Sequence, residues 1–387
     1  MKEKGFKAIL LRTLLQIVRR PVYWVGFFLF PLFCILFLTT EMEEGLPTHV
    51  PAAIIDHDGS AMSRQITQTL AGMEMIDYRS SCTSFTEARS KMQEGEIYGF
   101  FLIPDNFERD LLAGKSPSLT FYTNMSFYVP ASMLFKTFKS TATYAKAGVV
   151  MNVASTAGMN GNVTSMLMPV DIDTRGLGNP ELNYAVYLCN SFVPGVFQLM
   201  IMLMTCFALG QEVKTGSSRR LLGMADGNIY KVVAGKLLPQ TIIWWVLIIF
   251  MLSWLYHWQG YPMHGSWWWM TLSQLMFVLA SQALGVFFYG MIPNLRLALS
   301  ASALIGILTF SIAAYSFPLE SMYGSISIFS WILPARYNFL IYADQALNGL
   351  DIYYSRWWFV GYILIMLAPL TLMWRIRRVY MRQVYTP

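Results

Sequence analysis

Long apolar runs alternate with polar segments along this chain of 387 residues. A helix needs about 20 mostly apolar residues to cross the roughly 30 Å hydrocarbon core of a bilayer. Six runs are close to or above this length, and they cover residues 22–40, 184–209, 232–258, 267–292, 297–317 and 357–374. Tryptophans gather at the ends of several runs, as is typical of residues at a membrane interface. The pattern predicts a polytopic α-helical membrane protein with six transmembrane helices.

The apolar runs also set the expected order of segments. We expect transmembrane helix 1 at 21–40, helix 2 at 181–209, and helices 3–6 within 232–374. Residues 318–356 are too interrupted by Pro, Gly and charge to form a free span. Because lipid cannot satisfy irregular backbone, this outer hairpin is expected to form short helices packed against protein in the outer half of the bilayer.

Residues 1–20 carry apolar side chains at helical spacing. Lys4, Arg12 and Arg19 lie off this stripe. The stripe consists of Phe6, Ile9, Leu10, Thr13, Leu14, Ile17 and Val18. Such a pattern is typical of an amphipathic helix that lies in a membrane interface, so we expect a cytoplasmic interfacial helix flat on the inner leaflet.

The segment 41–180 has a different character. It holds 15 acidic against 10 basic residues, which separates it from the basic flanks of the other spans. Short strand patterns alternate with helix patterns, and Ser84 and Glu87 form a capping box at the start of one helix. The alternation predicts a βαβαβαβ series, followed by a long helix over 127–156. We therefore expect an extracytoplasmic α/β domain inserted between the first and second spans.

Positive charge gives the expected orientation. In the polar run 210–236, basic residues outnumber the acids Glu212 and Asp226; they are Lys214, Arg219, Arg220, Lys231 and Lys236. Excess Lys and Arg beside spans marks the cytoplasmic side. Residues 210–231 are accordingly predicted to be a cytoplasmic loop. Residues 375–387 are predicted to be a basic cytoplasmic tail, so both termini are expected in the cytoplasm.

Composition supports a membrane protein and narrows its chemistry. The chain is 55% hydrophobic with only 13% charged residues, against about 25% charged in soluble domains. Topology explains its net charge of +6, so nucleic acid is not an expected partner. No CxxC pair is present, and the four cysteines form no disulfide framework. His257 and His264 fit interfacial polar residues better than metal ligands, so no metal is expected.

The sequence also bears on the source of energy. It contains no GxxxxGK[ST] loop for binding ATP phosphates. Secondary transporters usually place acids within their spans to carry an ion, and the six predicted spans hold almost no charged residues. No catalytic residue is assigned. Energy for transport is therefore expected from a partner.

The chain resembles the permease subunits of type-2 ATP-binding-cassette (ABC) exporters along essentially its whole length. Residues 211–217, QEVKTGS, resemble the Glu-x-x-x-Gly-Thr/Ser coupling segment of that family, and Leu221, Leu222 and Gly235-Lys236 follow as usual. The start of the second span is matched by Asn179-Pro180-Glu181 and by Pro194-Gly195, and the outer hairpin by Pro318, Pro334, Arg336 and Tyr337. Ala225-Asp226 departs from the family, whose members often carry Thr-Pro there.

The resemblance implies one permease half of an exporter in the cell inner membrane. Its partners would be separate ABC ATPase subunits, which hold ATP and Mg, a second permease copy or paralogue, and membrane lipid. A periplasmic adaptor and an outer-membrane channel would extend it to a trans-envelope pump. The substrate would be an amphipathic, drug-like or lipid-like compound, as in multidrug efflux.

Within this picture, Glu212, Gly216, Ser217, Leu221 and Leu222 are the expected coupling residues. Glu212 is the key one, placed in the first turn of a short surface helix over 213–222. There it would pair with a basic residue of an ATPase or of the N-terminal helix; the alternative is a solvated cap with no role in coupling. The rival interpretation is a membrane-anchored sensor or scaffold whose 41–180 domain binds an extracellular ligand; six spans are more than an anchor needs. An intramembrane enzyme is disfavoured because the predicted spans hold almost no charged or His residues.

Overall fold

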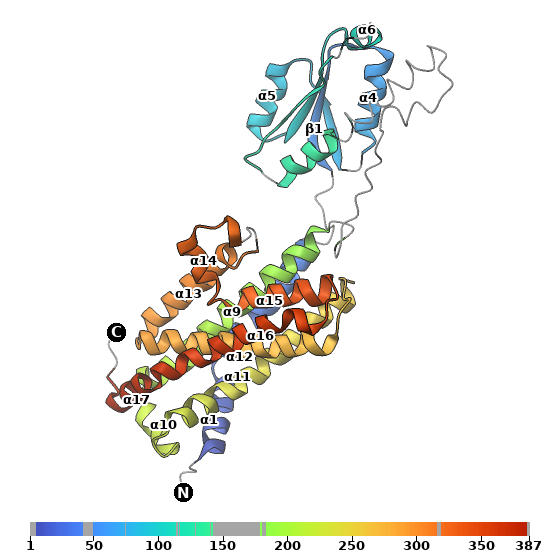
Figure 1. Ribbon diagram of the computed structural model, residues 1–387. Coiled ribbons are helices and arrows are strands. Elements are labelled where there is room, and N and C mark those ends of the chain that lie inside the picture. Colours follow the sequence, from blue (N-terminus) through green and yellow to red (C-terminus); the bar gives the residue numbers. More distant parts are fainter. Residues whose placement is uncertain are drawn as a thin grey trace. The chain divides into compact units, whose positions relative to one another are not determined.

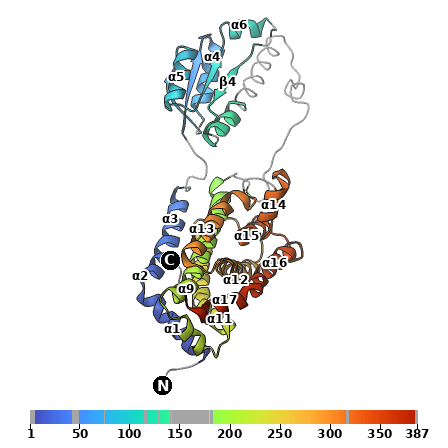
Figure 2. The same cartoon turned by 90° about the vertical axis from the view of Figure 1, so that its left-hand side faces the viewer.

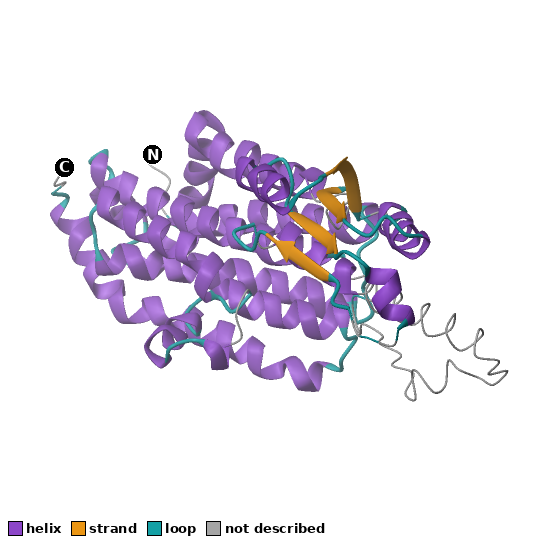
Figure 3. Cartoon of the chain, turned by 90° about the horizontal axis from the view of Figure 1, so that it is seen from above, coloured by secondary structure: helices purple, strands orange, loops and turns teal. Residues whose placement is uncertain are grey.

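The computed structural model describes residues 5–41, 49–73, 75–113, 115, 117–127, 129–139, 141, 179, 183–315 and 319–384. Pro318, Pro180-Glu181 and most of the helix expected over 127–156 lie outside these residues. The chain divides into two compact units, one made of 1–45 with 176–387 and the other of 46–175. All strands in the described part of the chain belong to the second unit (Figure 3).

Six helical segments in the described chain are long and apolar enough to cross a membrane, and all belong to the first unit. They are Pro21–Glu41, Tyr184–Lys214, Ile229–Trp258, Trp267–Met291, Leu295–Ile312 and Ile352–Arg382. The first follows α1 (Phe6–Arg19) and consists of α2 (Pro21–Trp24), a π-helix (Val25–Leu29) and α3 (Phe30–Glu41). The apolar runs therefore predicted the number of membrane-length helices correctly.

The remaining helices of this unit follow in chain order. They are α9 (Tyr184–Lys214), α10 (Ser218–Met224), α11 (Ile229–Leu252) with a π-helix (Ser253–Trp258), α12 (Trp267–Met291), α13 (Leu295–Ile312), a 3-10 turn (Leu319–Ser321), α14 (Gly324–Ser330), α15 (Pro334–Tyr342) with a π-helix (Ala343–Leu347), α16 (Ile352–Leu367), a 3-10 segment (Ala368–Leu372) and α17 (Met373–Arg382). The expected outer hairpin 318–356 thus contains short helices, as its interrupted sequence predicted.

Asparagine side chains fix the starts of three spans. Asn183 begins α9 by accepting the Ala185 N–H, and Asn228 begins α11 by accepting two backbone N–H groups. Asn294 does the same for α13 after a tight turn. Asparagine is a favoured N-cap because its side-chain oxygen satisfies N–H groups that have no partner within the helix.

The interior of the first unit is built around α9 and α12. In Figure 2 these helices lie between α3 on one side and α16 on the other, and their spans are the most buried in the unit. Gly285 of α12 allows the close packing: a Cβ at this position would lie 3.0 Å from the Thr205 Cβ and 3.1 Å from the Met202 carbonyl oxygen of α9. Small residues at helix crossings let backbones approach in this way.

The second unit is an α/β fold. Its sheet has the order β2-β1-β3-β4, in which β1 runs parallel to β2 and β3 while β4 is antiparallel. The strands are β1 (Val50–Asp56), β2 (Ile76–Ser81), β3 (Gly99–Ile103) and β4 (Thr120–Thr123). They alternate with α4 (Ala61–Ala71), α5 (Phe85–Glu94) and α6 (Phe107–Leu112), in the order that the pattern predicted.

Helices cover both faces of this sheet. Residues of α4 and of the helical segment 129–139 pack on one face, and α5 packs on the other (Figure 1). The predicted cap of α5 is present, since the Ser84 Oγ accepts the Glu87 N–H at 3.2 Å. The Glu87 carboxylate accepts the Thr83 N–H, and this hydrogen bond, together with Lys91, lowers the pKa of Glu87 below its usual value.

Three segments outside the predicted spans differ from the sequence prediction. The loop predicted over 210–231 is shorter, because α9 continues to Lys214 and α11 begins at Ile229. Within the predicted tail, residues up to Arg382 belong to α17. The N-terminal stripe is divided: Ile9, Thr13 and Ile17 are buried, whereas Phe6, Leu14 and Val18 are exposed.

Candidate functional site

Glu212 lies in the last turn of α9, not in the first turn of a following helix as expected. Only 2% of the residue is exposed. An acid is unfavourable at the C-terminal end of a helix, where the helix dipole is negative, and burial of an unpaired carboxylate adds a further cost. The surroundings must therefore supply positive charge and hydrogen-bond donors.

Both carboxylate oxygens of Glu212 are satisfied. The Lys236 ammonium lies 2.5 Å from Oε1, which also accepts from the Gln16 amide at 3.0 Å. The Arg12 guanidinium donates to Oε2 at 2.7 Å, and the Ser217 hydroxyl donates to the same oxygen. Lys236 also donates to the Gln16 Oε1 at 3.3 Å. We call these five residues the Glu212 cluster.

The Glu212 cluster joins four segments of the chain. Arg12 and Gln16 come from α1, Glu212 from α9, and Lys236 from α11. Ser217 belongs to the connection between α9 and α11, which covers residues 215–228 and contains α10. The cluster therefore holds the N-terminal helix and the connection against two membrane-length helices.

A glycine makes this approach of α1 to α11 feasible. A Cβ at Gly235 would lie 2.8 Å from the Ile9 Cγ2, which is closer than normal van der Waals contact. Lys236 follows directly in sequence and is 1% exposed. The pair Gly235-Lys236 thus combines a close helix crossing with the buried cation.

The connection from 215 to 228 is fastened to α17. Gly216 adopts a positive φ of 68°, which suits a residue without a side chain, and its carbonyl accepts from the Gln383 amide. The Ser218 hydroxyl donates to the Tyr380 carbonyl at 3.0 Å. The Arg219 Nε donates to the Met381 carbonyl at 2.6 Å. The connection and α17 therefore form one packed element.

Leu221 and Leu222 are not surface residues. They are 1% and 6% exposed and pack in an apolar cluster with residues of α1, α9 and α17. The exposed residues between 214 and 228 are Lys214, Thr215, Gly216, Arg219, Arg220, Gly223, Asp226 and Asn228. Of the expected coupling residues, Glu212 and Ser217 come together, Gly216 shapes the turn, and the two leucines anchor α10.

Pro194 and Gly195 lie well inside α9, because that helix already begins at Tyr184. The role at the span entry that the family resemblance implies for them stays a prediction. Gly195 faces α13, where its Cβ would lie 2.7 Å from the Phe310 Cε1. Its role is close helix packing.

The hairpin residues form a separate polar region. Pro334 occupies the first turn of α15, and the neighbouring Ala335 N–H donates to the Gln198 side chain of α9 at 2.7 Å. Arg336 is buried over the Trp331 ring at 4.7 Å, and the Tyr337 hydroxyl donates to the Trp331 carbonyl at 2.6 Å. The Ala335 hydrogen bond fixes the hairpin against α9, and the contacts with Trp331 hold the hairpin together. None of these contacts includes the Glu212 cluster.

One of the two pairings considered for Glu212, with a basic residue of the N-terminal helix, is present, because Arg12 of α1 makes this contact. Sequence reasoning did not identify Arg12 itself or the second cation, Lys236, as the partners. The signal that could have found them is the i, i+4 spacing of Arg12 and Gln16, which places two long polar side chains on one face of α1. Within the described residues, no three His, Cys, Asp or Glu side chains could hold a metal ion.

Comparison with protein families gives a match over almost the whole chain. A family described as ABC-2 family transporter protein matches residues 21–375. A comparison with curated proteins finds no match. The family match covers five of the six membrane-length helices completely and most of the sixth. The chain is therefore a multi-pass membrane protein of the ABC-2 transporter family, the membrane subunit that works with an ABC ATPase.

Proposed function

We propose that this chain is the permease half of an ATP-driven exporter and that the Glu212 cluster transmits movement of the ATPase to the spans. The observation that carries the proposal is that one buried carboxylate binds α1, α11 and the connection after α9. A push on residues 215–228 therefore acts on three helices together. Rigid-body movement of packed helices is a known form of two-state change.

The location of charge supports the direction of this coupling. The exposed cations Lys214, Arg219 and Arg220 surround the connection, and such excess indicates the cytoplasmic side. ATP and Mg would be bound by two separate ATPase subunits on that side, and a second copy or paralogue of this chain would complete the pathway. The cargo would be an amphipathic, drug-like or lipid-like compound carried outward across the inner membrane. A sensor or scaffold fits the family assignment less well.

The test replaces Glu212 with Gln, which keeps the shape and removes the charge. The complex with its ATPase is reconstituted in vesicles, and ATP turnover and the movement of a panel of fluorescent amphiphilic dyes are measured. We expect dye transport to fall at least about tenfold, equivalent to roughly 1.4 kcal/mol of lost coupling, while the ATPase remains bound and active.

The matched control is Asp226→Asn. Asp226 is an exposed acid of the same connection, and its Lys231 partner is 4.0 Å away. Its replacement should leave transport unchanged, because exposed ion pairs contribute little. Equal transport by the Glu212→Gln complex and the unaltered complex would contradict the proposed role of the cluster.

A further inference from the structure

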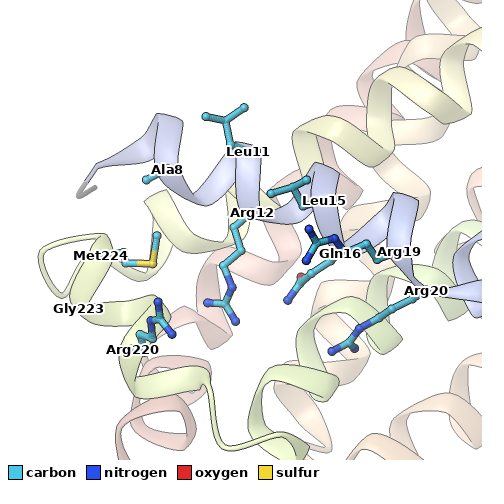
Figure 4. Close-up of a pocket in the computed structure, with 10 residues that line it drawn as sticks. All are labelled: Ala8, Leu11, Arg12, Leu15, Gln16, Arg19, Arg20, Arg220, Gly223 and Met224. Atoms are coloured by element: carbon cyan, nitrogen blue, oxygen red, sulfur yellow. The ribbon is translucent and has the colours of Figure 1, made fainter. Parts of the chain in front are cut away.

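An open cavity of about 780 Å³ lies between α1 and α10. Arginines from both helices line it: Arg12, Arg19 and Arg20 from the α1 end, and Arg220 from α10. Figure 4 shows Arg12, Arg20 and Arg220 extending into the space between the two helices. The cavity therefore gathers four guanidinium groups.

The described acids neutralise only part of the positive charge of this cavity. Glu212 is the acid that pairs with Arg12, and it already carries the Lys236 ion pair. Among the residues that the structure describes, no acidic side chain forms an ion pair with Arg19, Arg20 or Arg220. The Arg12 Nη1 is buried and has no hydrogen-bond partner. The arrangement favours an anion that accepts several hydrogen bonds, as a phosphate does.

The same cavity also has an apolar wall. Leu11 and Leu15 line it and are 52% and 54% exposed. Leu14 and Val18 are exposed on the same helix. An amphipathic helix with exposed leucines beside arginines is suited to the headgroup and acyl boundary of a membrane. A ligand that fits both walls carries a phosphate and an acyl chain.

We propose that this cavity binds the phosphate headgroup of an anionic membrane phospholipid, with its acyl chain along Leu11 and Leu15. Basic pockets between helices on the cytoplasmic side of membrane proteins recognise such headgroups. Arg19, Arg20 and Arg220 hold the phosphate. Arg12 stands between the headgroup and Glu212, so the bound lipid contacts the Glu212 cluster.

The test titrates the full chain in detergent with phosphatidylglycerol or with phosphatidylcholine of the same acyl chains. Intact-protein mass spectrometry measures the bound lipid. We expect phosphatidylglycerol to bind preferentially. Arg19→Gln with Arg220→Gln should weaken its apparent affinity about thirtyfold, at roughly fivefold for each basic residue removed, and leave phosphatidylcholine unaffected.

The matched control is Arg375→Gln with Arg377→Gln, which removes two exposed arginines of α17 outside the cavity and should keep the preference. If the double cavity variant does not fold, Arg220→Gln alone should lose about fivefold. Equal loss in cavity and control variants would overturn the proposal.

Two further measurements distinguish a bound lipid from a free anion and from a docked protein. If glycerol phosphate displaces phosphatidylglycerol at the concentration of the lipid itself, the site takes a free anion and the proposal is wrong. If the cavity variant keeps its lipid affinity but no longer retains the ATPase subunit, the cavity is a protein-docking site instead. Lipid loss with the ATPase retained supports the proposal.

Discussion

At the scale of single residues, the carboxylate of Glu212 and the ammonium of Lys236 depend on one another. Both residues are almost fully buried, and the two groups lie 2.5 Å apart. A buried pair often adds little net stability, because both charges lose their hydration. Removing one partner is costly, since it leaves an uncompensated charge in a poorly hydrated environment.

Lys236→Met tests this dependence. The substitution keeps a similar chain length but removes the cation, so we expect the free energy of unfolding to fall by about 3 to 5 kcal/mol. Denaturant unfolding of the purified chain, followed by tryptophan fluorescence, measures it. The control Lys231→Met removes a half-exposed lysine at 4.0 Å from Asp226 and should cost less than about 1 kcal/mol.

The double variant Lys236→Met with Glu212→Gln should be more stable than Lys236→Met alone, because the buried carboxylate that has lost its ammonium partner and keeps only Arg12 as a cation is then absent. Equal losses for Lys236→Met and Lys231→Met would show that the buried pair has no special importance.

At the scale of elements, features that depend on local sequence were predictable, whereas features that depend on contacts between helices were not. The six spans were predictable because each is a continuous apolar run, and the α/β order was predictable from local alternation and the Ser84 cap. The burial of Glu212 was not predictable from its neighbours, since Gln211 and Lys214 are typical of a surface. It depends on Arg12, which is 200 positions away in the chain.

The same limit explains the other differences. Residues 375–382 look like a solvated basic tail, yet Ile376 and Tyr380 are buried. The Tyr380 hydroxyl donates to the Leu209 carbonyl of α9 at 2.8 Å. Proline is unfavourable inside a helix, yet α9 continues through Pro194 from Tyr184 to Lys214. Tertiary packing overrides the local preference in each case.

Gly235→Ala tests the crossing of α1 and α11. The new methyl group would lie too close to the Ile9 Cγ2, so we expect a loss of about 1 to 3 kcal/mol from overpacking. Unfolding of the purified chain measures it. Adding Ile9→Ala should recover part of the loss, with a coupling of about 1 kcal/mol or more between the two sites.

The control for this crossing is Gly223→Ala in α10. A Cβ at Gly223 has no atom within 4 Å, and alanine is favoured over glycine in a helix by about 0.5 to 1 kcal/mol. This variant should be as stable as the original or more so. Additive effects of Gly235→Ala and Ile9→Ala would contradict the proposed contact.

At the scale of the whole molecule, membrane topology connects the two units to function. The exporter proposal requires the unit 46–175 outside and the connection 215–228 inside. The chain offers suitable reporter positions, because Asp105 and Lys214 are exposed within their units. The natural cysteines interfere little, since Cys82, Cys189 and Cys206 are buried.

Asp105→Cys and Lys214→Cys test the orientation. In intact spheroplasts, a membrane-impermeant maleimide should label Asp105→Cys, whereas Lys214→Cys should react only after permeabilisation. The unsubstituted chain, with its half-buried Cys34, sets the background. Labelling of Asp105→Cys from the cytosolic side alone would place the α/β unit inside and exclude the proposed arrangement.

The wide sequence spacing of the Glu212 cluster also has a consequence for biosynthesis. Arg12 precedes Glu212 by 200 residues, and a ribosome adds about 5 to 20 residues per second. Roughly 10 to 40 s therefore separate the synthesis of the cation from that of its carboxylate. During this interval α1 lacks its contacts with Glu212 and Lys236, and its exposed leucines allow the helix to lie on the membrane surface. Docking of α1 is thus a late step of assembly, which must wait for the second and third spans.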